Sequence, residues 1–287
     1  MKPLLIYGAN GYTGRLIVEE ALRRGVRPIL SGRSAAVRAI ADALGLEYRL
    51  ASLDNPTALD RALAGVGAVI HAAGPFSRTS EPMVDACMRA RVPYLDITGE
   101  ITVFERCAAR DAEARQAGVM LLPGAGFDVV PSDCLAAHLA RRLPGATALT
   151  LAFHGGSSVS HGTATTMAEN IGRGGAVRRR GAITPVPAAW RTRSVTFADK
   201  PRLTVTIPWG DISTAFHSTG IPDITVYTAA PQSSVRAMRL TRYFGWLLAT
   251  PPAQWMLKRA IDARPAGPDE HHRARARAQL WGEVTHP

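Results

Sequence analysis

The sequence predicts an α/β protein: a Rossmann-type, doubly wound parallel sheet, followed by a second domain of the α+β class. Three observations lead to this prediction. The first half alternates short apolar runs with helix-like stretches, a glycine-rich turn at Gly8–Gly14 follows the first of these runs, and the alternation stops after Leu122. Strands that alternate with helices through short connections form a parallel sheet, which binds ligands at the carboxyl ends of its strands.

Six apolar runs predict the strands of the first sheet: Leu4–Tyr7, Pro28–Ser31, Glu47–Leu50, Ala68–Ala72, Tyr94–Ile97 and Val119–Leu122. The stretches between these runs predict five helices: Tyr12–Arg24, Ser34–Leu44, Pro56–Ala64, Glu81–Ala90 and Thr102–Gln116. Each connection is short, as expected of repeated strand–helix units.

The second half has a less regular pattern. The flexible connection Pro123–Gly126 predicts a boundary between a domain of residues 1–125 and a domain of residues 126–287. We expect the second domain to shape a substrate pocket or a dimer interface. Its predicted helices and strands are a helix from Pro131 or Ser132 to Leu143, strands at Ala148–His154, Leu203–Ile207 and Ile224–Thr228, and helices at Ser233–Leu248 and Pro252–Ala263.

Composition narrows the classes of function. No segment has the roughly 18 uninterrupted apolar residues of a membrane-spanning helix, and the short run Leu4–Tyr7 is no secretory signal, so we expect a cytoplasmic protein. The net charge is +11, and residues 126–287 carry 19 basic against 10 acidic side chains. This excess favours an anionic substrate, a coenzyme A ester or an acidic lipid surface, or reflects only a codon preference for arginine. The arginines are scattered among few aromatic residues, so no nucleic acid partner is expected.

Cysteine and histidine give no sign of a metal site. The cysteines Cys87, Cys107 and Cys134 lie far apart, and the adjacent His271 and His272 belong to no metal-binding motif. The three cysteines are expected to be small buried residues of a reducing compartment.

The turn Gly8–Gly14 predicts a dinucleotide site. A GxxGxxG pattern between a strand and a helix provides a tight turn, a close approach to pyrophosphate and close helix packing, and the helix N-terminus attracts the phosphates. A glycine trio alone would be an ordinary turn, but here the strand and the helix are both predicted. The expected phosphate-binding residues are Gly8, Asn10, Gly11, Tyr12, Thr13 and Gly14.

The end of the second strand indicates which dinucleotide is bound. An NAD site usually has an acidic residue there, whereas this chain has Ser31, Gly32, Arg33 and Ser34. The guanidinium of Arg33 suits the 2′-phosphate of NADP(H), and Ser31 or Ser34 would add a donor. The alternative is that Arg33 is an ordinary surface residue. At the end of the fourth strand, Ala73, Gly74, Pro75 and Phe76 suit passage of the nicotinamide ribose or form a plain turn.

These motifs together resemble the saccharopine dehydrogenase-like oxidoreductases, which include trans-acting enoyl reductases of bacterial lipid synthesis. The likeness extends through Tyr94–Glu100, Gly126–Asp133, Gly162-Thr163 and Asn170–Gly175. The resemblance implies an NADP-binding Rossmann domain and a second domain that shapes the substrate pocket, with no implication that saccharopine is the substrate. Proteins of this kind continue beyond a Trp-Gly-Glu segment, found here at Trp281–Glu283, so a C-terminal segment is expected to be lacking.

Three residues are candidates for protonating the product of hydride transfer: Glu100, Asp128 and His161. Alternatively, Glu100 starts a helix, Asp128 caps a helix together with Ser132 and Asp133, and His161 is an ordinary polar residue.

The apolar stretches Tyr243–Leu248 and Trp255–Leu257 are flanked by basic residues. We expect them to form a pair of helices that packs in the core or in a dimer interface, and the alternative is that they contact a membrane. The sequence therefore predicts an NADPH-dependent reductase of a small, anionic or acyl substrate, in a possible homodimer. The alternative is an NADPH-binding scaffold or lipid-surface protein without catalysis.

Overall fold

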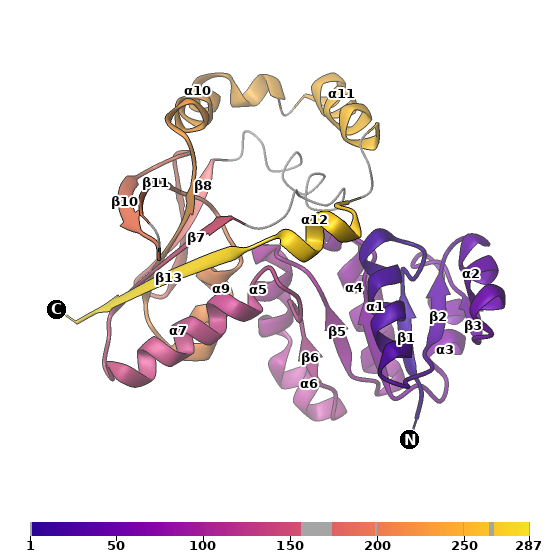
Figure 1. The fold of residues 1–287 in the computed structure, drawn as a ribbon. Coiled ribbons are helices and arrows are strands. Elements are labelled where there is room, and N and C mark those ends of the chain that lie inside the picture. The colour runs from indigo at the N-terminus through magenta and orange to yellow at the C-terminus, as the bar shows by residue number, and fades with distance from the viewer. Residues whose placement is uncertain (1, 156–173, 199, 249, 264–266, 287) are drawn as a thin grey trace. The chain divides into compact units, whose positions relative to one another are not determined.

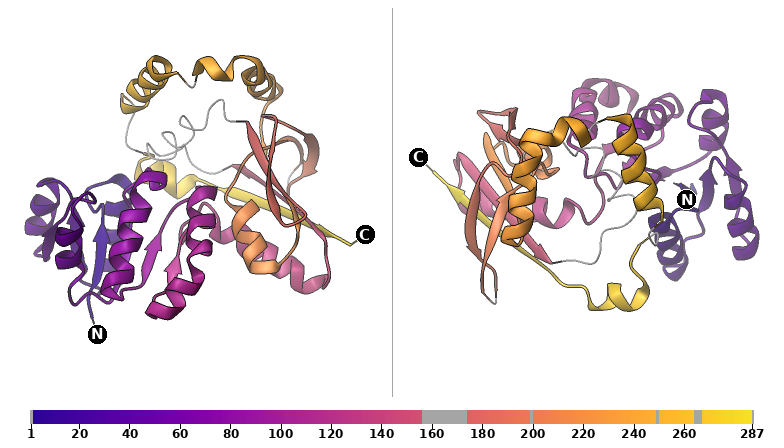
Figure 2. Two further views of the ribbon diagram at one scale, coloured as in Figure 1. Left: turned by 180° about the vertical axis from the view of Figure 1, so that it is seen from behind. Right: turned by 90° about the horizontal axis from the view of Figure 1, so that it is seen from above.

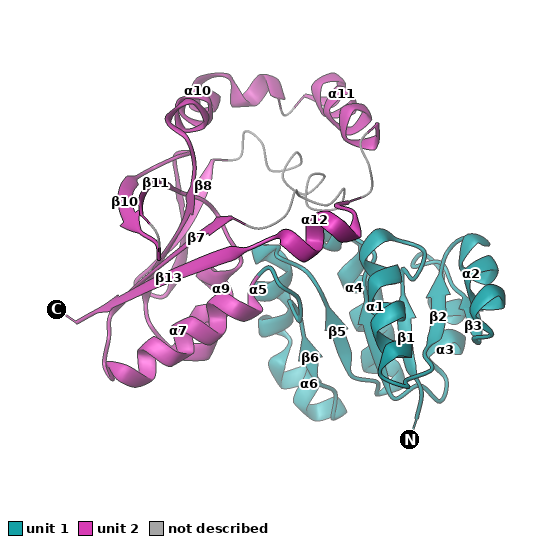
Figure 3. Cartoon of the chain, in the orientation of Figure 1, with its two compact units in different colours: residues 1–128 teal, residues 129–287 magenta. Residues whose placement is uncertain are grey.

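The computed structural model describes residues 2–155, 174–198, 200–248, 250–263 and 267–286 (Figure 1). The chain divides into two compact units, Met1–Asp128 and Val129–Pro287 (Figure 3). The second unit begins three residues later than the predicted domain, so Asp128 belongs to unit 1.

Unit 1 is the predicted doubly wound sheet. Its strands are all parallel and follow the order β3-β2-β1-β4-β5-β6. This order reverses between β1 and β4, which is where such sheets bind their ligands. The strands are β1 (Leu4–Tyr7), β2 (Ile29–Gly32), β3 (Tyr48–Leu50), β4 (Ala68–His71), β5 (Tyr94–Asp96) and β6 (Leu121–Leu122). The helices are α1 (Tyr12–Arg23), α2 (Ala36–Leu44), α3 (Pro56–Leu63), α4 (Phe76–Ala90), α5 (Ile101–Ala109) and α6 (Asp111–Ala117).

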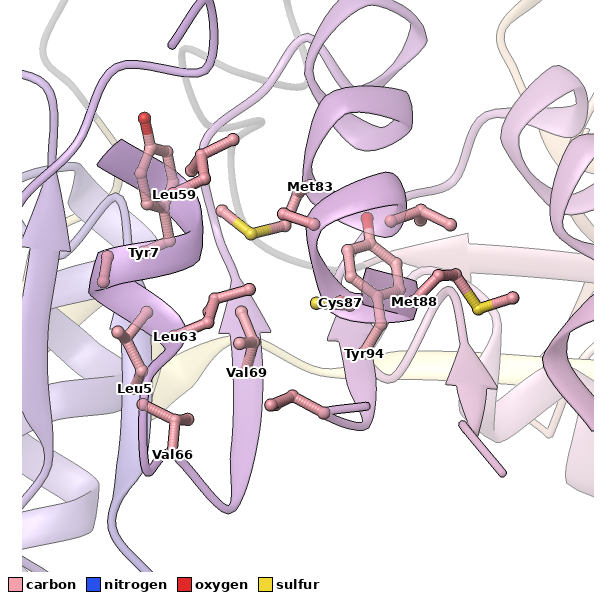
Figure 4. Close-up of a cluster of buried hydrophobic side chains, with 14 of the residues drawn as sticks. Leu5, Tyr7, Leu59, Leu63, Val66, Val69, Met83, Cys87, Met88 and Tyr94 are labelled. Atoms are coloured by element: carbon pink, nitrogen blue, oxygen red, sulfur yellow. The ribbon is translucent and has the colours of Figure 1, made fainter. Parts of the chain in front are cut away.

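The alternation of side chains along β1 explains why helices cover both faces of the sheet. Ile6 packs in a cluster with residues of α1 and α2, whereas its neighbours Leu5 and Tyr7 belong to a larger cluster with residues of α3 to α6. Successive strand residues point to opposite faces, so a strand that is apolar throughout requires cover on both sides. Figure 4 shows the larger cluster, in which Met83 and Cys87 of α4 lie between the sheet residues.

Two helix predictions in unit 1 were wrong in their bounds. The single predicted helix Thr102–Gln116 is two helices that meet at Arg110, because the break lets α5 bury Val103 and Cys107 while α6 turns Ala114 into the same core. Helix α4 begins at Phe76 rather than at Glu81, because Glu100 satisfies the first amides of the helix, as described below.

Unit 2 is an α+β unit, as predicted, built on a mixed sheet of order β10-β11-β12-β7-β13, with β8 paired to β12 and β9 paired to β8. Strands β7 and β12 are parallel, and the other pairs are antiparallel. Its strands are β7 (Ala148–Gly155), β8 (Gly175–Arg179), β9 (Ala182–Val186), β10 (Thr192–Thr196), β11 (Pro201–Thr206), β12 (Asp223–Ala229) and β13 (Ala278–Thr285). Its helices are α7 (Val130–Arg142), α9 (Asp211–Thr219), α10 (Gln232–Leu248), α11 (Pro251–Asp262) and α12 (Glu270–Arg275).

One face of the central strands of unit 2 packs against helices. Leu149 and Leu151 of β7 and Ile224 and Val226 of β12 are buried, and α7 and α9 pack on these strands. Helices α10 and α11 lie on the side of unit 2 away from α7 (Figures 1 and 2). None of the described helices is both long and apolar enough to cross a membrane.

Candidate cofactor-binding site

The turn after β1, Gly8–Gly14, is so tight that some of its positions require glycine. We name it the glycine frame. Gly8 has φ of +84°, a region that residues with a side chain rarely adopt. A Cβ on Gly14 would lie 2.1 Å from the carbonyl oxygen of Gly8, so α1 contacts the turn without room for any side chain. Helix α1 begins at Tyr12, and at its N-cap, Gly11, no described side chain accepts a hydrogen bond from the helix. The first amides of α1 are therefore arranged as an anion-binding helix start.

The turn is held to both neighbouring strands. The Gly8 amide donates a hydrogen bond of 2.8 Å to the Ser31 carbonyl at the end of β2. On the other side, a Cβ on Gly8 would lie 2.9 Å from the Cβ of Ala73, which follows β4. Three segments that are distant in the sequence, after β1, β2 and β4, thus meet at the predicted ligand edge of the sheet.

The end of β2 has no carboxylate among residues 31–34, as expected, but one predicted cofactor contact differs. The residues there are Ser31, Gly32, Arg33 and Ser34; Arg33 is exposed and Ser34 is partly exposed. Ser31 is fully buried, and its hydroxyl donates to the Arg49 carbonyl at 2.7 Å. The prediction that the Ser31 side chain contacts a phosphate was therefore wrong, because its hydroxyl joins β2 to β3 within the core.

Glu100 lies at the start of α4. Its two carboxylate oxygens accept hydrogen bonds from the amides of Phe76 and Ser77, at 2.8 and 2.9 Å. A carboxylate at this position satisfies two amides that a helix start leaves without partners and interacts favourably with the helix dipole. Glu100 is also the N-cap residue of α5, as the helix-start alternative predicts, but its side chain orients the turn Gly74–Phe76, a role that was not predicted.

Asp128 lies near Glu100 in unit 1. A Cβ on Gly99 would be 3.1 Å from an Asp128 carboxylate oxygen, so this carboxyl group lies against the backbone that follows β5. Burial raises the pKa of Asp128 above its usual value. A carboxyl group with a raised pKa keeps its proton to higher pH than an exposed aspartate, which suits a proton donor.

The predicted start of α7 is confirmed only in part, because Asp133 places an acidic group in the first turn but the expected cap is not formed by the described side chains. The N-cap residue is Val129, without a capping side chain among the described residues. Ser132 lies inside the helix and donates to the Val129 carbonyl, whereas Asp133 accepts a hydrogen bond of 2.6 Å from the Ser218 hydroxyl of α9. These two side chains stabilise the packing of unit 2. The third catalytic candidate, His161, lies outside the described residues.

Two buried polar residues at this edge were not predicted as site residues. Asp96 accepts hydrogen bonds from the Tyr94 hydroxyl and from the amides of Thr98 and Gly124, and so fixes the two connections that follow β5 and β6. His71, at the end of β4, is fully buried among the rings of Tyr7, Phe76 and Tyr94. Its burial lowers the pKa to about 3, so the ring is neutral. The sequence showed that both residues end strands, but not that either is enclosed.

The prediction for the apolar helices near the C-terminus is corrected in part. Tyr243, Phe244, Trp246 and Trp255 are all more than half exposed, so they do not belong to the core of the chain. Of the cysteines, Cys87 and Cys107 are buried as expected, whereas Cys134 is exposed.

Comparison with known proteins identifies the first domain. Residues 4–122 match the family described as the saccharopine dehydrogenase NADP binding domain. This region of the chain is therefore similar to the NADP-binding domain of saccharopine dehydrogenases. Its cofactor is NADP(H), and the glycine frame fits it, because a bound pyrophosphate needs the close backbone approach that Gly8 and Gly14 allow.

Relatives and solved structures agree with this assignment. Over 148 residues the chain is 30% identical to a trans-acting enoyl reductase of Mycobacterium ulcerans and 31% identical to one of Mycobacterium tuberculosis. Each alignment covers 48% of this chain and 35% of the relative, so the chain spans about a third of the length of the curated relatives that it matches. Apo saccharopine dehydrogenase (L-Glu forming) from Saccharomyces cerevisiae, 13% identical, superposes with a TM-score of 0.60 over 96% of this chain and 70% of that chain. The NADP-binding domain and the second unit therefore share the fold of that enzyme.

Proposed function

We propose that this protein is an NADPH-dependent reductase of a small, acyl or anionic substrate with an activated double bond. The observation that carries this proposal is the glycine frame after β1, which meets the Ala73 turn after β4 and leaves Arg33 exposed at the end of β2. The relatives named trans-acting enoyl reductases support an enoyl group as the substrate class.

Each part of the site then has a task. When bound, NADPH would supply the hydride that saturates the double bond. The amides at the start of α1 hold the pyrophosphate, and Arg33 holds the 2′-phosphate by a charge-assisted, forked contact. Glu100 orients the turn Gly74–Phe76 beside the cofactor. The carboxyl group of Asp128 holds the proton that the reduced product requires, because burial favours its protonated form.

The test is NADPH oxidation by the full chain with a panel of enoyl thioesters, enals, ketones and imines. We expect turnover with enoyl substrates. Asp128→Asn should lower kcat by about 100-fold, in the range of a lost acid catalyst, while the Kd for NADPH stays unchanged. Asp54→Asn, at an exposed aspartate of the same unit, is the control. NADPH binding without turnover on any substrate of the panel would favour a non-catalytic NADPH-binding scaffold instead.

A second candidate function is supported by the exposed face of α10 and α11. This apolar face consists of Leu240, Tyr243, Phe244, Trp246, Leu247, Trp255 and Met256. On α10, residues 240, 243, 244 and 247 form one stripe, and the buried Val235 and Gly245 lie on the other side of the helix. Arg236, Arg239 and Arg242 are the only charged residues of α10. An exposed apolar stripe with cations is typical of a helix that lies on an anionic bilayer.

Vesicle co-sedimentation tests this lipid-surface function. The full chain should bind vesicles that contain phosphatidylserine, and Phe244→Ser with Tyr243→Ser should reduce the bound fraction by about tenfold, since two large apolar side chains are lost from the stripe. Leu44→Ser, at an exposed leucine of α2, is the control. If the wild-type chain instead forms a dimer that both substitutions disrupt and leaves vesicles unbound, the face is a dimer interface.

A further inference from the structure

A pocket on the sheet of unit 2 collects arginine side chains. Its volume is about 430 Å³. We name it the arginine pocket and define it by its lining residues Ala148, Leu149, Thr150, Arg178, Arg179, Arg180, Trp190, Arg191, Arg193, Asp223, Thr225 and Tyr227. The volume lies within the range of about 300 to 1,000 Å³ that is typical of small-molecule sites.

The floor of the arginine pocket is the face of β7 and β12 that is turned away from α7 and α9. Thr150 pairs with Thr225, and Tyr227 lies two residues further along β12, so these three side chains point to the same face. The apolar residues between them point to the opposite face, towards α7 and α9. Burial raises the pKa of Tyr227, so its hydroxyl stays protonated and can donate a hydrogen bond. The floor therefore offers three hydroxyl groups.

The walls of the pocket hold their guanidinium groups in fixed places. Trp190 lies in the connection between β9 and β10, and its ring contacts two guanidinium groups. The guanidinium carbons of Arg179 and Arg191 are 4.4 and 4.0 Å from its ring centroid. These cation–π contacts restrict both side chains before any ligand binds. Within the described part of the chain, neither Arg179 nor Arg191 has an acidic partner.

Two further arginines are fixed by other contacts. Arg193 lies 4.8 Å from the Trp281 ring centroid and 3.3 Å from the Glu283 carboxylate. Arg178, almost fully buried, donates to the carbonyls of Ile212 and Gly181. Arg178 pairs in the sheet with Ile224 and contacts the Phe216 ring of α9, so its charge lies toward α9, whereas Arg179, Arg191 and Arg193 are preorganised at the pocket.

Positive charge in the pocket is not balanced. Besides Arg178, four arginines line it, and the carboxylates that the described residues place beside these four are Asp223 and Glu283. One oxygen of Asp223 accepts the backbone amide of Arg180, a residue with φ of +49° in the β8–β9 turn. This carboxylate therefore stabilises the turn as well as contributing its charge.

We propose that the arginine pocket binds a phosphate-bearing small molecule. A carboxylate has two oxygens for the many donors of the guanidinium and hydroxyl groups, whereas a phosphate group has three terminal oxygens and almost two negative charges. Arginine forks match phosphate geometry, and the pocket has room for an organic group as well. This site lies entirely in unit 2 and goes beyond the proposed reductase function, which concerns the glycine frame of unit 1.

The experiment is calorimetric titration of the full chain with pyrophosphate, after the cofactor site has been saturated with NADP⁺. Arg179→Gln with Arg191→Gln should weaken pyrophosphate binding by about tenfold or more, because two charge-assisted contacts are lost. Arg141→Gln with Arg142→Gln removes the same charge from exposed positions of α7 and is the matched control, with an expected loss of less than about twofold. NADP⁺ binding should be unchanged in both variants.

Other probes define the ligand and separate its sources. Inorganic phosphate, adenosine 3′,5′-bisphosphate, citrate and phosphatidylglycerol vesicles are titrated in parallel. We expect both phosphate compounds to bind more tightly than citrate. Preference for vesicles, lost in the same double variant, would assign the phosphate to a lipid headgroup. Equal binding of citrate, equal weakening in the control pair, or no pyrophosphate binding by the wild-type chain would overturn the proposal. Arg179→Lys with Arg191→Lys, which keeps the charge, provides a second measurement if the glutamine variant unfolds.

Discussion

The cofactor-binding edge of unit 1 and the arginine pocket of unit 2 are built from different materials. The first is a backbone frame in which Gly8 and Gly14 exclude side chains and the amides at the start of α1 face the ligand. The second is a set of charged side chains, held in place by Trp190 and by carbonyl groups. An atom added to the glycine frame should displace its backbone and abolish tight binding at once, whereas the arginine pocket should lose affinity in steps as charges are removed. The following predictions test this difference.

The largest effect is expected at Gly14. In Gly14→Ala the new Cβ would lie 2.1 Å from the Gly8 carbonyl oxygen, so the turn or the helix must shift. We expect NADPH binding to weaken on the order of 100-fold and the free energy of unfolding to fall by about 1–3 kcal/mol. Calorimetry and chemical unfolding measure the two effects. Gly25→Ala, at a φ of +74° and in open space, should cost about 1 kcal/mol in stability without affecting binding. Unchanged NADPH affinity in Gly14→Ala would refute the backbone frame.

The next effect concerns the choice of cofactor. Arg33→Asp places a carboxylate where a 2′-phosphate is expected, so the affinity for NADPH should fall by about 10- to 100-fold, whereas NADH binding changes little. Competition binding of the two cofactors measures the ratio, and Arg61→Asp, another exposed arginine of unit 1, is the control. An equal loss for both cofactors would show that Arg33 does not contact the 2′-phosphate.

A smaller effect is expected in the pH dependence of stability. The pKa of His71 is about 3 in the folded protein and about 6.5 in the unfolded chain, so the unfolded state binds a proton between these values that the folded state does not. Stability is therefore fully present above about pH 6.5 and is lost as the pH falls. His71→Leu should reduce the loss between pH 6.5 and pH 5 by about 2 kcal/mol. Chemical unfolding at several pH values tests this, with His138→Leu at an exposed position as the control. An unchanged pH dependence would mean that His71 is accessible to protons.

The smallest effect is expected at Glu100, whose side chain caps the start of α4. Glu100→Ala leaves the amides of Phe76 and Ser77 without their acceptor and should lower the free energy of unfolding by about 1–2 kcal/mol. Glu100→Gln keeps one acceptor oxygen and should cost less. Glu19→Ala, at an exposed position of α1, is the control in the same unfolding measurements. Equal stability of the alanine and wild-type proteins would show that the cap contributes nothing.

Features that depend on residues close together in the chain could be predicted from the sequence. The alternation of apolar runs predicted the parallel sheet, the spacing of Gly8, Gly11 and Gly14 predicted the turn, and the missing acid after β2 indicated NADP(H). All of these act over a few residues, where periodicity and glycine content are informative.

Contacts that join segments far apart in the sequence could not be predicted and are seen only in the tertiary structure. Ser31 is turned into the core by its bond to Arg49, Glu100 reaches the start of α4, and β13 pairs with β7 across more than a hundred residues. The arginine pocket combines β7, β8, β10 and β12, whose side chains meet only because the sheet orders its strands differently from the chain. Periodicity shows which face of a strand is apolar, but strand order and register decide which charged groups come together on the other face.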